Sequence, residues 1–174
     1  MHGIRDNYRK VPKSYRMIKV ANEAVHDNKF CNNQVRSCEL PIQKGGRYYG
    51  NVDILGPDGR YHSINALIDS GNDITILTRS TSESIGFNPD AIKSRFYVKG
   101  INGEAREFSE VPTKIKPCGN FTPMDASIGL AIQQDSLSDN LLGRSGIFDS
   151  GKIEVIYDSD SITFREKTKG VCGI

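Results

Sequence analysis

A succession of short β-type runs, separated by turn residues, limits the possible folds more than any other feature of this sequence. Residues 48–55 and 61–68 alternate between apolar and polar side chains, and a Gly-Pro-Asp-Gly segment at 56–59 lies between them. This pattern predicts a β-hairpin whose second strand leads directly into Asp69. Regularly spaced short strands with Gly, Asn and Asp turns indicate a mainly β domain, either a sandwich or a barrel.

Other segments of the same texture extend this prediction along the chain. A second hairpin is expected from residues 95–100 and 105–108, which flank an Ile-Asn-Gly turn at 101–103. A single helical turn is expected at 81–85. Further short strands are expected at 74–77, 113–116, 126–132, 153–157 and 161–164.

The size and composition of the chain fit one folded domain with extensions. The chain has 174 residues, of which 37% are hydrophobic and 25% charged. These values are typical of a globular protein of one domain, or of one domain with a tail. We expect a basic and polar N-terminal arm at residues 1–38, which could contain a short helix at 15–25. The domain itself is expected at 39–166, followed by a C-terminal tail at 167–174.

Charge and hydropathy argue against several classes of partner. No apolar run approaches the ~18 residues that a membrane helix needs, and the N-terminus lacks the apolar core of a secretory signal. Lys and Arg number 23 against 21 Asp and Glu, a net charge of +2. A nucleic-acid binder that uses the basic arm is an alternative, but it would need a β-surface with interleaved aromatic side chains. Trp is absent and aromatic residues are only 8%, so we expect neither a membrane nor a nucleic-acid partner.

The four cysteines are scattered, with no pair at metal-binding spacing. Without a secretory signal, free thiols in a reducing compartment are the expectation. A zinc site from His26, Cys31 and Cys38 is an alternative, although the two cysteines are seven residues apart and structural zinc ligands favour spacings of two to four.

One motif carries chemistry: the acidic residue Asp69, followed by Ser70 and Gly71, at the exit of an apolar strand. Carboxylates are seldom buried unless they are paired or functional. The hydroxyl of Ser70 can brace a turn, and Gly71 permits a close backbone approach. Taken alone, the segment would be interpreted as an ordinary turn, because all three residue types are common in turns.

Together with two further motifs, this segment resembles the retropepsin-like aspartic proteases. The first motif is Leu-Ile-Asp-Ser-Gly at 67–71, followed by the apolar run 74–77. The second is the glycine-containing hairpin Val-Lys-Gly-Ile-Asn-Gly at 98–103, at the position of the family's flap. The third is Asn-Leu-Leu-Gly-Arg at 140–144, which is similar to the family's second signature of an apolar pair followed by Gly-Arg. The three motifs occur in the family's order, and the resemblance spans residues 40–164.

The resemblance implies a mainly β acid-protease barrel with one lobe per chain and a short helix after the Gly-Arg signature. It implies an aspartic endopeptidase that cleaves a peptide or polyprotein substrate, with no metal and no cofactor. In this chemistry two carboxylates share one proton, because two like charges so close together cannot both ionise. With one such motif per chain, the second carboxylate is Asp69 of another subunit, so a homodimer is implied. A cytoplasmic or virion-associated location is expected.

Roles for individual residues follow from the same resemblance. Asp69 is the expected catalytic residue, and Ser70 and Gly71 support it. Arg144 is expected to pair with Asp73. The residues expected to bind substrate are Asp73 and the flap residues Gly100, Ile101, Asn102 and Gly103, and the expected structural residues are Gly143 and Arg144.

A second Asp-Ser-Gly segment, at Asp149, suggests a single-chain enzyme with two catalytic motifs. That would require two lobes, each with its own hairpin, flap and Gly-Arg signature, and the sequence contains one set. We therefore expect Asp149 to play no catalytic part. The alternative function is a non-catalytic binding or assembly module on the same fold, since a fold does not determine a function.

Overall fold

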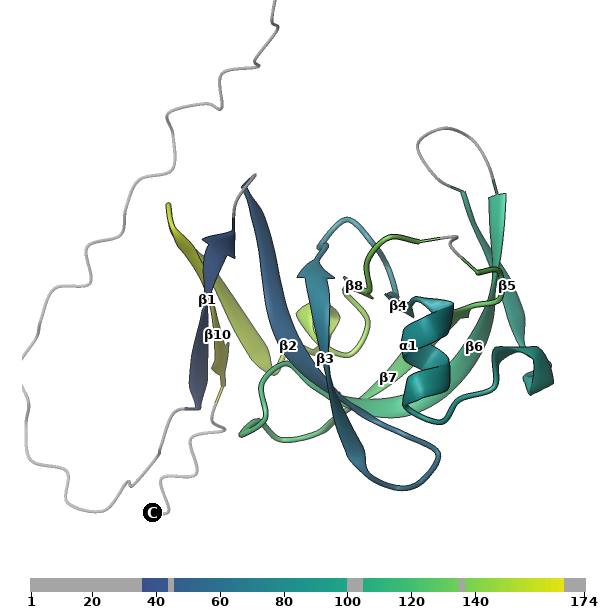
Figure 1. Cartoon of the computed structure of the whole chain (residues 1–174). Helices are drawn as coiled ribbons and strands as arrows, with labels where there is room; N and C mark the ends of the chain where they lie inside the picture. Colours follow the sequence, from purple (N-terminus) through teal and green to yellow (C-terminus); the bar gives the residue numbers. More distant parts are fainter. Residues whose placement is uncertain (1–35, 44–45, 100–104, 135–136, 168–174) are drawn as a thin grey trace, which may run out of the picture. The chain divides into compact units, whose positions relative to one another are not determined.

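The computed structural model describes residues 36–43, 46–99, 105–134 and 137–167 (Figure 1). Most of the expected N-terminal arm, the flap residues 100–103 and most of the C-terminal tail lie outside these ranges. The elements are β1 (Ser37–Gln43), β2 (Arg47–Leu55), β3 (Tyr61–Ile68), β4 (Thr75–Leu77), α1 (Arg79–Ser84), η1 (Pro89–Ala91), β5 (Arg95–Lys99), β6 (Ala105–Lys116), β7 (Met124–Ala131), β8 (Leu141–Leu142), η2 (Phe148–Ser150), β9 (Ile153–Tyr157) and β10 (Ser161–Glu166).

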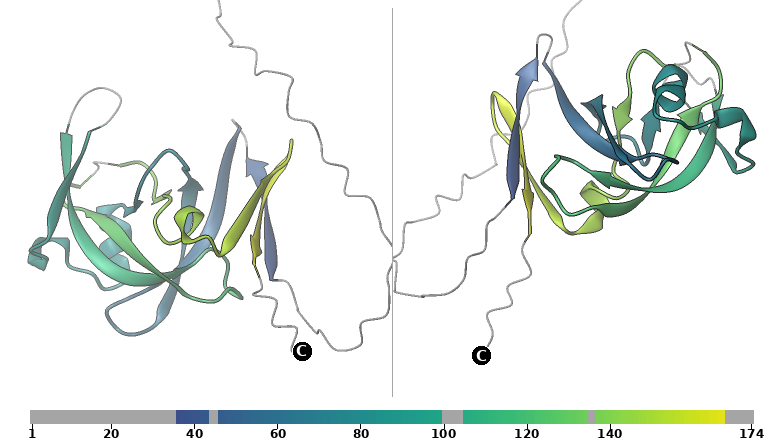
Figure 2. Two further views of the ribbon diagram at one scale, coloured as in Figure 1. Left: turned by 180° about the vertical axis from the view of Figure 1, so that it is seen from behind. Right: turned by 60° about the horizontal axis from the view of Figure 1, so that its bottom comes forward.

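The strands form one sheet that closes on itself. The ten strands follow the order β5-β6-β7-β4-β8-β3-β2-β1-β10-β9, and β6 also pairs with β2. This extra pairing closes a ring through β2, β3, β8, β4, β7 and β6. The β5–β6 hairpin extends from one side of the ring, while β1, β10 and β9 continue the sheet on the other (Figures 1 and 2). The prediction of a mainly β barrel is confirmed.

The β2–β3 hairpin confirms the first prediction from the sequence pattern. Val52 pairs with Ile64, and both side chains are buried in the core. The turn closes through a 3.0 Å hydrogen bond from Gly59 N to the Gly56 carbonyl, and Gly59 has a φ of +76°. Glycine is suited to this position because side chains rarely adopt a positive φ. The hairpin ends with β3 at Ile68, so Asp69 is the first residue after the strand and lies at the edge of the ring.

Strand β6 is longer than the sequence pattern indicated. The two strands expected at 105–108 and 113–116 are one continuous strand, which pairs with β5 at its start and with β7 over most of its length. Ser109 and Glu110 interrupt the apolar alternation, yet the hydrogen-bond ladder continues through them to Leu130 and Gly129. The long strand connects the hairpin to the ring without a break.

A short strand, β8, lies between β3 and β4 and was not expected as a strand. It runs parallel to β3, with Leu67 opposite Leu141, and antiparallel to β4, with Ile76 opposite Leu141. This strand is the apolar pair of the Gly-Arg signature. Because β3 and β4 flank the Asp69 loop, β8 brings the second signature against the first.

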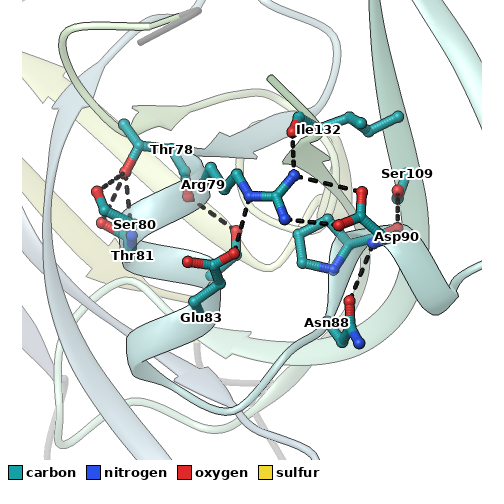
Figure 3. Close-up of polar contacts among 11 residues, drawn as sticks. Thr78, Arg79, Ser80, Thr81, Glu83, Asn88, Asp90, Ser109 and Ile132 are labelled. Carbon is teal, nitrogen blue, oxygen red and sulfur yellow. Dashed lines mark hydrogen bonds and ion pairs between the residues drawn. The ribbon is translucent and has the colours of Figure 1, made fainter. Parts of the chain in front are cut away.

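The helix α1 confirms the expected helical turn and is anchored at its first residue. The Thr78 side chain caps it by accepting a hydrogen bond from Thr81 N. The Arg79 guanidinium contacts Glu83 at 2.8 Å, Asp90 at 2.6 Å and the carbonyl oxygen of Ile132 (Figure 3). These contacts tie α1 and the following loop to the end of β7.

The short helix expected after the Gly-Arg signature is η2, a single 3-10 turn.

The terminal strands form their own antiparallel ladders, in which β1 pairs with β10 and β10 with β9. A disulfide joins Cys38 of β1 to Cys118, with Cα atoms 6.5 Å apart, a separation that suits such a bond. The expectation of free thiols is therefore wrong for this pair, because the fold brings together cysteines that are 80 residues apart. The disulfide also engages Cys38, one of the three residues of the alternative zinc site. The other two, His26 and Cys31, lie outside the described ranges.

Within the described ranges, no helix has the length and apolar character required to cross a membrane. The same residues contain no group of three or more His, Cys, Asp or Glu side chains arranged to hold a metal ion.

Candidate active site

Asp69 follows β3 directly, and hydrogen bonds from two directions fix it. Its backbone N–H donates to the Leu142 carbonyl of β8 at 3.0 Å. Its carboxylate Oδ1 accepts a hydrogen bond from Gly71 N at 3.0 Å. The Asn72 N–H donates to the Asp69 carbonyl at 3.1 Å and closes the turn. Asp69 as a residue is half-buried, and the hydrogen bond from Gly71 N holds its carboxylate in a defined direction.

The Gly-Arg signature supports the Asp69 loop through backbone hydrogen bonds. Arg144 N donates to the Asn72 carbonyl at 2.8 Å, and Ser145 N donates to the Asp73 carbonyl at 2.9 Å. Gly143 N donates to the hydroxyl of Thr75 at 3.2 Å. The loop thus has hydrogen-bond partners that lie about seventy residues away in the sequence.

Gly143 is packed too closely against this loop for any other residue type to fit. A Cβ atom at this position would collide with the carbonyl group of Ile74 and lie 2.9 Å from the Asn72 carbonyl oxygen. Both are backbone groups, which cannot move without displacing the loop itself. The close approach explains the need for glycine in the signature.

Asp73 and Arg144 form an ion pair beside the loop, with 2.5 Å between Asp73 Oδ1 and Arg144 Nη2. Arg144 Nε also lies 3.8 Å from Asp149 Oδ2. The Asp73 side chain is 84% exposed, so the pair contributes little to stability and the carboxylate remains open to solvent.

A cleft of about 470 Å³ opens beside Asp69. Its polar end is formed by Asp69, Gly71 and Asn72, and its apolar wall includes Ile76, Phe108 and Leu141. Val98, Lys99 and Arg106 of the β5–β6 hairpin line the side opposite the loop. The cleft therefore lies between the candidate catalytic group and the hairpin in which the flap was expected.

The hairpin is anchored at its base by an aromatic pair. Phe96 of β5 and Phe108 of β6 stack with ring centroids 5.5 Å apart, and Phe108 is almost fully buried. The four residues at the tip that were expected to bind substrate, Gly100 to Gly103, lie outside the described ranges.

The described fold matches solved structures of aspartic proteases. A retropepsin-like aspartic protease from Rickettsia conorii matches with a TM-score of 0.54 at 16% sequence identity, over 76% of this chain and 92% of that chain. The protease of EIAV in complex with the inhibitor HBY-793 matches with a TM-score of 0.41 at 21% sequence identity, over 58% of this chain and 85% of that chain. The retroviral protease-like domain of Ddi1 from Leishmania major matches with a TM-score of 0.37 at 16% sequence identity, over 67% of this chain and 91% of that chain. No family model matches the sequence, and no curated protein matches it.

The fold is retropepsin-like. The match to the Rickettsia structure and the ring of strands around β8 confirm the resemblance at the level of the fold. In this chain the Asp-Ser-Gly loop and the Gly-Arg signature lie next to each other.

Asp149 does not share the cleft of Asp69. It borders a different hollow of about 330 Å³, together with Met124, Ser145 and Lys152. Asp69 does not border this hollow. The two Asp-Ser-Gly segments of this chain therefore border two different hollows.

A roomier groove of about 870 Å³ is lined by apolar groups, among them Pro57, Phe87 and Val111. Its two charged residues, Lys114 and Asp125, are paired with each other at 2.6 Å. Asp125, the one carboxylate of this described lining, is engaged by Lys114 and belongs to no Asp-Ser-Gly loop, so the Asp69 cleft is the stronger candidate for aspartic-protease chemistry.

Two residues that hold the site together lie within the quoted motifs, but the sequence patterns gave them no role. Thr75 is fully buried in β4, where its hydroxyl accepts the hydrogen bond from Gly143. The Asn140 side chain accepts from Thr78 N at 2.9 Å and donates to the Asn65 carbonyl at 2.9 Å. A threonine within the apolar run 74–77 was a signal for a buried hydroxyl that needs a partner. The partner itself required the fold.

Proposed function

We propose that the chain is an aspartic endopeptidase, active as a homodimer in which each subunit contributes Asp69. The observation that supports this most directly is the Asp69 carboxylate, which is oriented by Gly71 N and borders a cleft that is also lined by the β5–β6 hairpin. An extended peptide fits such a cleft, because its backbone can lie between the loop and the hairpin.

In the proposed reaction the two Asp69 carboxyl groups share one proton. The ionised group accepts a proton from a water molecule whose oxygen attacks the peptide carbonyl carbon, while the protonated group donates a hydrogen bond to the carbonyl oxygen. As the carbon–nitrogen bond breaks, the carboxyl group that took the proton from water donates it to the departing amine nitrogen. This step restores the carboxyl pair with its one shared proton. The Gly71 N–H holds one carboxylate oxygen, so each Asp69 keeps a single orientation during the reaction.

A second subunit is needed because the described lining of the cleft contains one carboxylate, that of Asp69. Asp149 borders a separate hollow and is engaged by Arg144. A two-fold axis beside Asp69 would bring two identical carboxylates together, as an isologous interface requires.

The remaining site residues have supporting roles in this proposal. Ser70, which is exposed, would donate or accept a hydrogen bond across the dimer beneath the carboxylates. Asp73, also exposed, would bind the substrate backbone while Arg144 holds it. The flap residues Gly100, Ile101, Asn102 and Gly103 would close over the peptide and exclude water.

Incubation with a mixed peptide library from pH 4 to 7 tests the function. The wild type should cleave peptides with a bell-shaped pH dependence, because the rate falls when both carboxyl groups ionise and when both are protonated. Asp69→Asn should abolish cleavage and preserve the fold, since the amide keeps the shape but cannot share the proton. Asp149→Asn is the matched control and should keep most of the activity.

Equal losses from the two substitutions would overturn the role given to Asp69 and support two catalytic motifs in one chain. A wild type that cleaves no peptide would favour the non-catalytic binding or assembly module. Cleavage that is abolished by a chelator would indicate a metal-dependent mechanism instead.

A further inference from the structure

The charges around the Asp69 cleft are unequal. The described residues that line it include two cations, Lys99 and Arg106, and one carboxylate, Asp69. The remaining lining side chains are mostly apolar, among them Val98, Phe108 and Leu141. A cleft with this lining attracts anionic groups, and its apolar walls strengthen the attraction by reducing the screening effect of water.

The strand register places Arg106 on the inner face of the hairpin. Phe96 lies opposite Phe108, and Val98 lies opposite Arg106, two residues further toward the tip. Side chains two residues apart on a strand point to the same face. Because Phe108 is buried against the ring and lines the cleft, Arg106 extends from the same face above the cleft.

The neighbouring cations differ from Arg106 in their surroundings. Arg95, at the start of β5, donates hydrogen bonds to the Pro89 carbonyl and to Ser109. Arg144 is paired with Asp73. Neither Arg95 nor Arg144 is among the described residues that line the cleft, whereas Lys99 and Arg106 are.

We propose that the preferred substrates carry an acidic side chain, Asp or Glu, which Arg106 binds beside the bond to be cleaved, with Lys99 adding to the attraction. This inference rests on the proposed function and specifies its substrate class. In a homodimer each subunit supplies one Arg106, so the preference for acidic side chains occurs at two positions, one on each side of the cleaved bond. The carboxylate pair with its shared proton carries a single negative charge, which leaves the positive charge of the described cleft lining in excess.

Arginine suits this role because its planar guanidinium can form two parallel hydrogen bonds with one carboxylate. Lys99 follows Val98 in β5 and therefore projects from the other face of the strand, so it adds a compact point charge at longer range. Since both side chains are exposed in the unliganded cleft, their effect on specificity should be moderate and should weaken at high salt.

Matched peptide substrates that differ only by Glu or Gln at one position test the proposal. For the wild type, replacing Glu by Gln should lower kcat/KM by roughly two- to fivefold, and 0.5 M salt should reduce the difference. Arg106→Glu should reverse the preference toward Lys-containing peptides, and Arg106→Gln should remove it. Lys93→Glu, at an exposed position before β5 that does not line the cleft, is the matched control and should keep the wild-type preference.

Binding measured separately from cleavage distinguishes failure of this inference from failure of the proposed function. Fluorescence anisotropy with the same labelled Glu and Gln peptides, on full-length Asp69→Asn protein, should show tighter binding of the Glu peptide, and the difference should be lost in Asp69→Asn/Arg106→Gln. Equal binding and equal cleavage of the two peptides would overturn the inference, even if the wild type is an active protease. Tighter Glu binding by the Asp69→Asn protein, together with a wild type that cleaves neither peptide, would support Arg106 as the acid-binding residue and refute the proposed function.

Discussion

Asp69, the proposed catalytic residue, is held in place by segments that are distant in the sequence. Its carboxylate is oriented locally by Gly71 N, but its backbone is held by Leu142 of β8. The next residues of the loop are held by Arg144 and Ser145. Removing the carboxylate should therefore affect the reaction and leave the loop in place, whereas disturbing Gly143 should affect both.

Gly143→Ala tests this dependence. The added methyl group would collide with the backbone of Ile74 and Asn72, so the free energy of unfolding should fall by roughly 1–3 kcal/mol. Peptide cleavage should fall as well, because the displaced loop carries Asp69. Urea denaturation and peptide cleavage measure the two effects.

Gly119→Ala is the matched control for this substitution. A Cβ at Gly119 would lie 3.4 Å from Asp53 Oδ2, an ordinary contact. Its stability should change by less than about 0.5 kcal/mol. If the two alanine variants unfold at the same urea concentration, the tight packing at Gly143 does not support the loop as described.

At the scale of elements, the Arg79 cluster joins α1, the loop before β5 and the end of β7. A hydrogen bond from Arg79 to Asp90 lowers the pKa of the Asp90 carboxyl below its ordinary value of 3.8, and the positive charges of Arg79 and Arg95 add to this effect. The ionised form is therefore favoured in the folded protein. Its stabilising contribution is present above the ordinary pKa and is lost as the pH falls through the lowered value.

Asp90→Asn should reduce the acid dependence of stability. The wild type should melt at a lower temperature at pH 3 than at pH 5, partly because the Asp90 carboxyl takes up a proton more readily in the unfolded chain than in the folded protein. The variant should melt below the wild type at pH 5, and its Tm should fall less between the two pH values. Asp160→Asn, at an exposed position, is the control and should follow the wild type. A variant with the wild-type decrease in Tm would contradict the role of this ion pair.

The disulfide fixes β1 to the segment that follows β6. It closes a loop of 80 residues, and the restriction of the unfolded chain should stabilise the fold by up to about 4.5 kcal/mol. Cys118→Ser, or reduction of the wild type, should therefore lower Tm clearly. Thermal unfolding with and without dithiothreitol measures this. An unchanged Tm under reducing conditions would show that the two cysteines are not bonded in the protein.

Local patterns predicted some elements and could not predict others. The β2–β3 hairpin follows from alternation and a glycine turn, which are encoded in neighbouring residues. In contrast, β8 has two residues and becomes a strand only between β3 and β4. The Cys38–Cys118 bond and the closure of β2 on β6 likewise join distant segments. Periodicity contains no information about such contacts.

The candidate site shows the same division. The Asp-Ser-Gly and Gly-Arg motifs pointed to Asp69 and Arg144 as candidates, and the structure places their two loops in contact. The buried hydroxyl of Thr75 and the two side-chain hydrogen bonds of Asn140 became recognisable only from the packing of β3, β4 and β8. The position of Arg106 above the cleft depends on the register of β5 and β6, which the turn at 101–103 alone did not determine.

At the scale of the whole molecule, the proposed enzyme is incomplete as a single chain. Its described cleft contains one carboxylate, and the reaction needs two. When the protein is diluted below its dimer dissociation constant, activity should therefore fall more steeply than the enzyme concentration. The axis of the dimer is proposed to pass beside Asp69. The pairing of β1 with β10 and of β10 with β9 within one chain occupies edges of these strands that could otherwise join subunits.

A mixing experiment tests the central claim most directly. Wild-type protein is mixed with Asp69→Asn protein at constant total concentration, subunits are allowed to exchange, and peptide cleavage is measured against the wild-type fraction. If each active site takes one Asp69 from each subunit, an equal mixture should retain about a quarter of the wild-type activity, because mixed dimers carry one working carboxylate. An equal mixture that retains about half, with activity proportional to the wild-type fraction, would mean that each chain acts alone and would contradict the account.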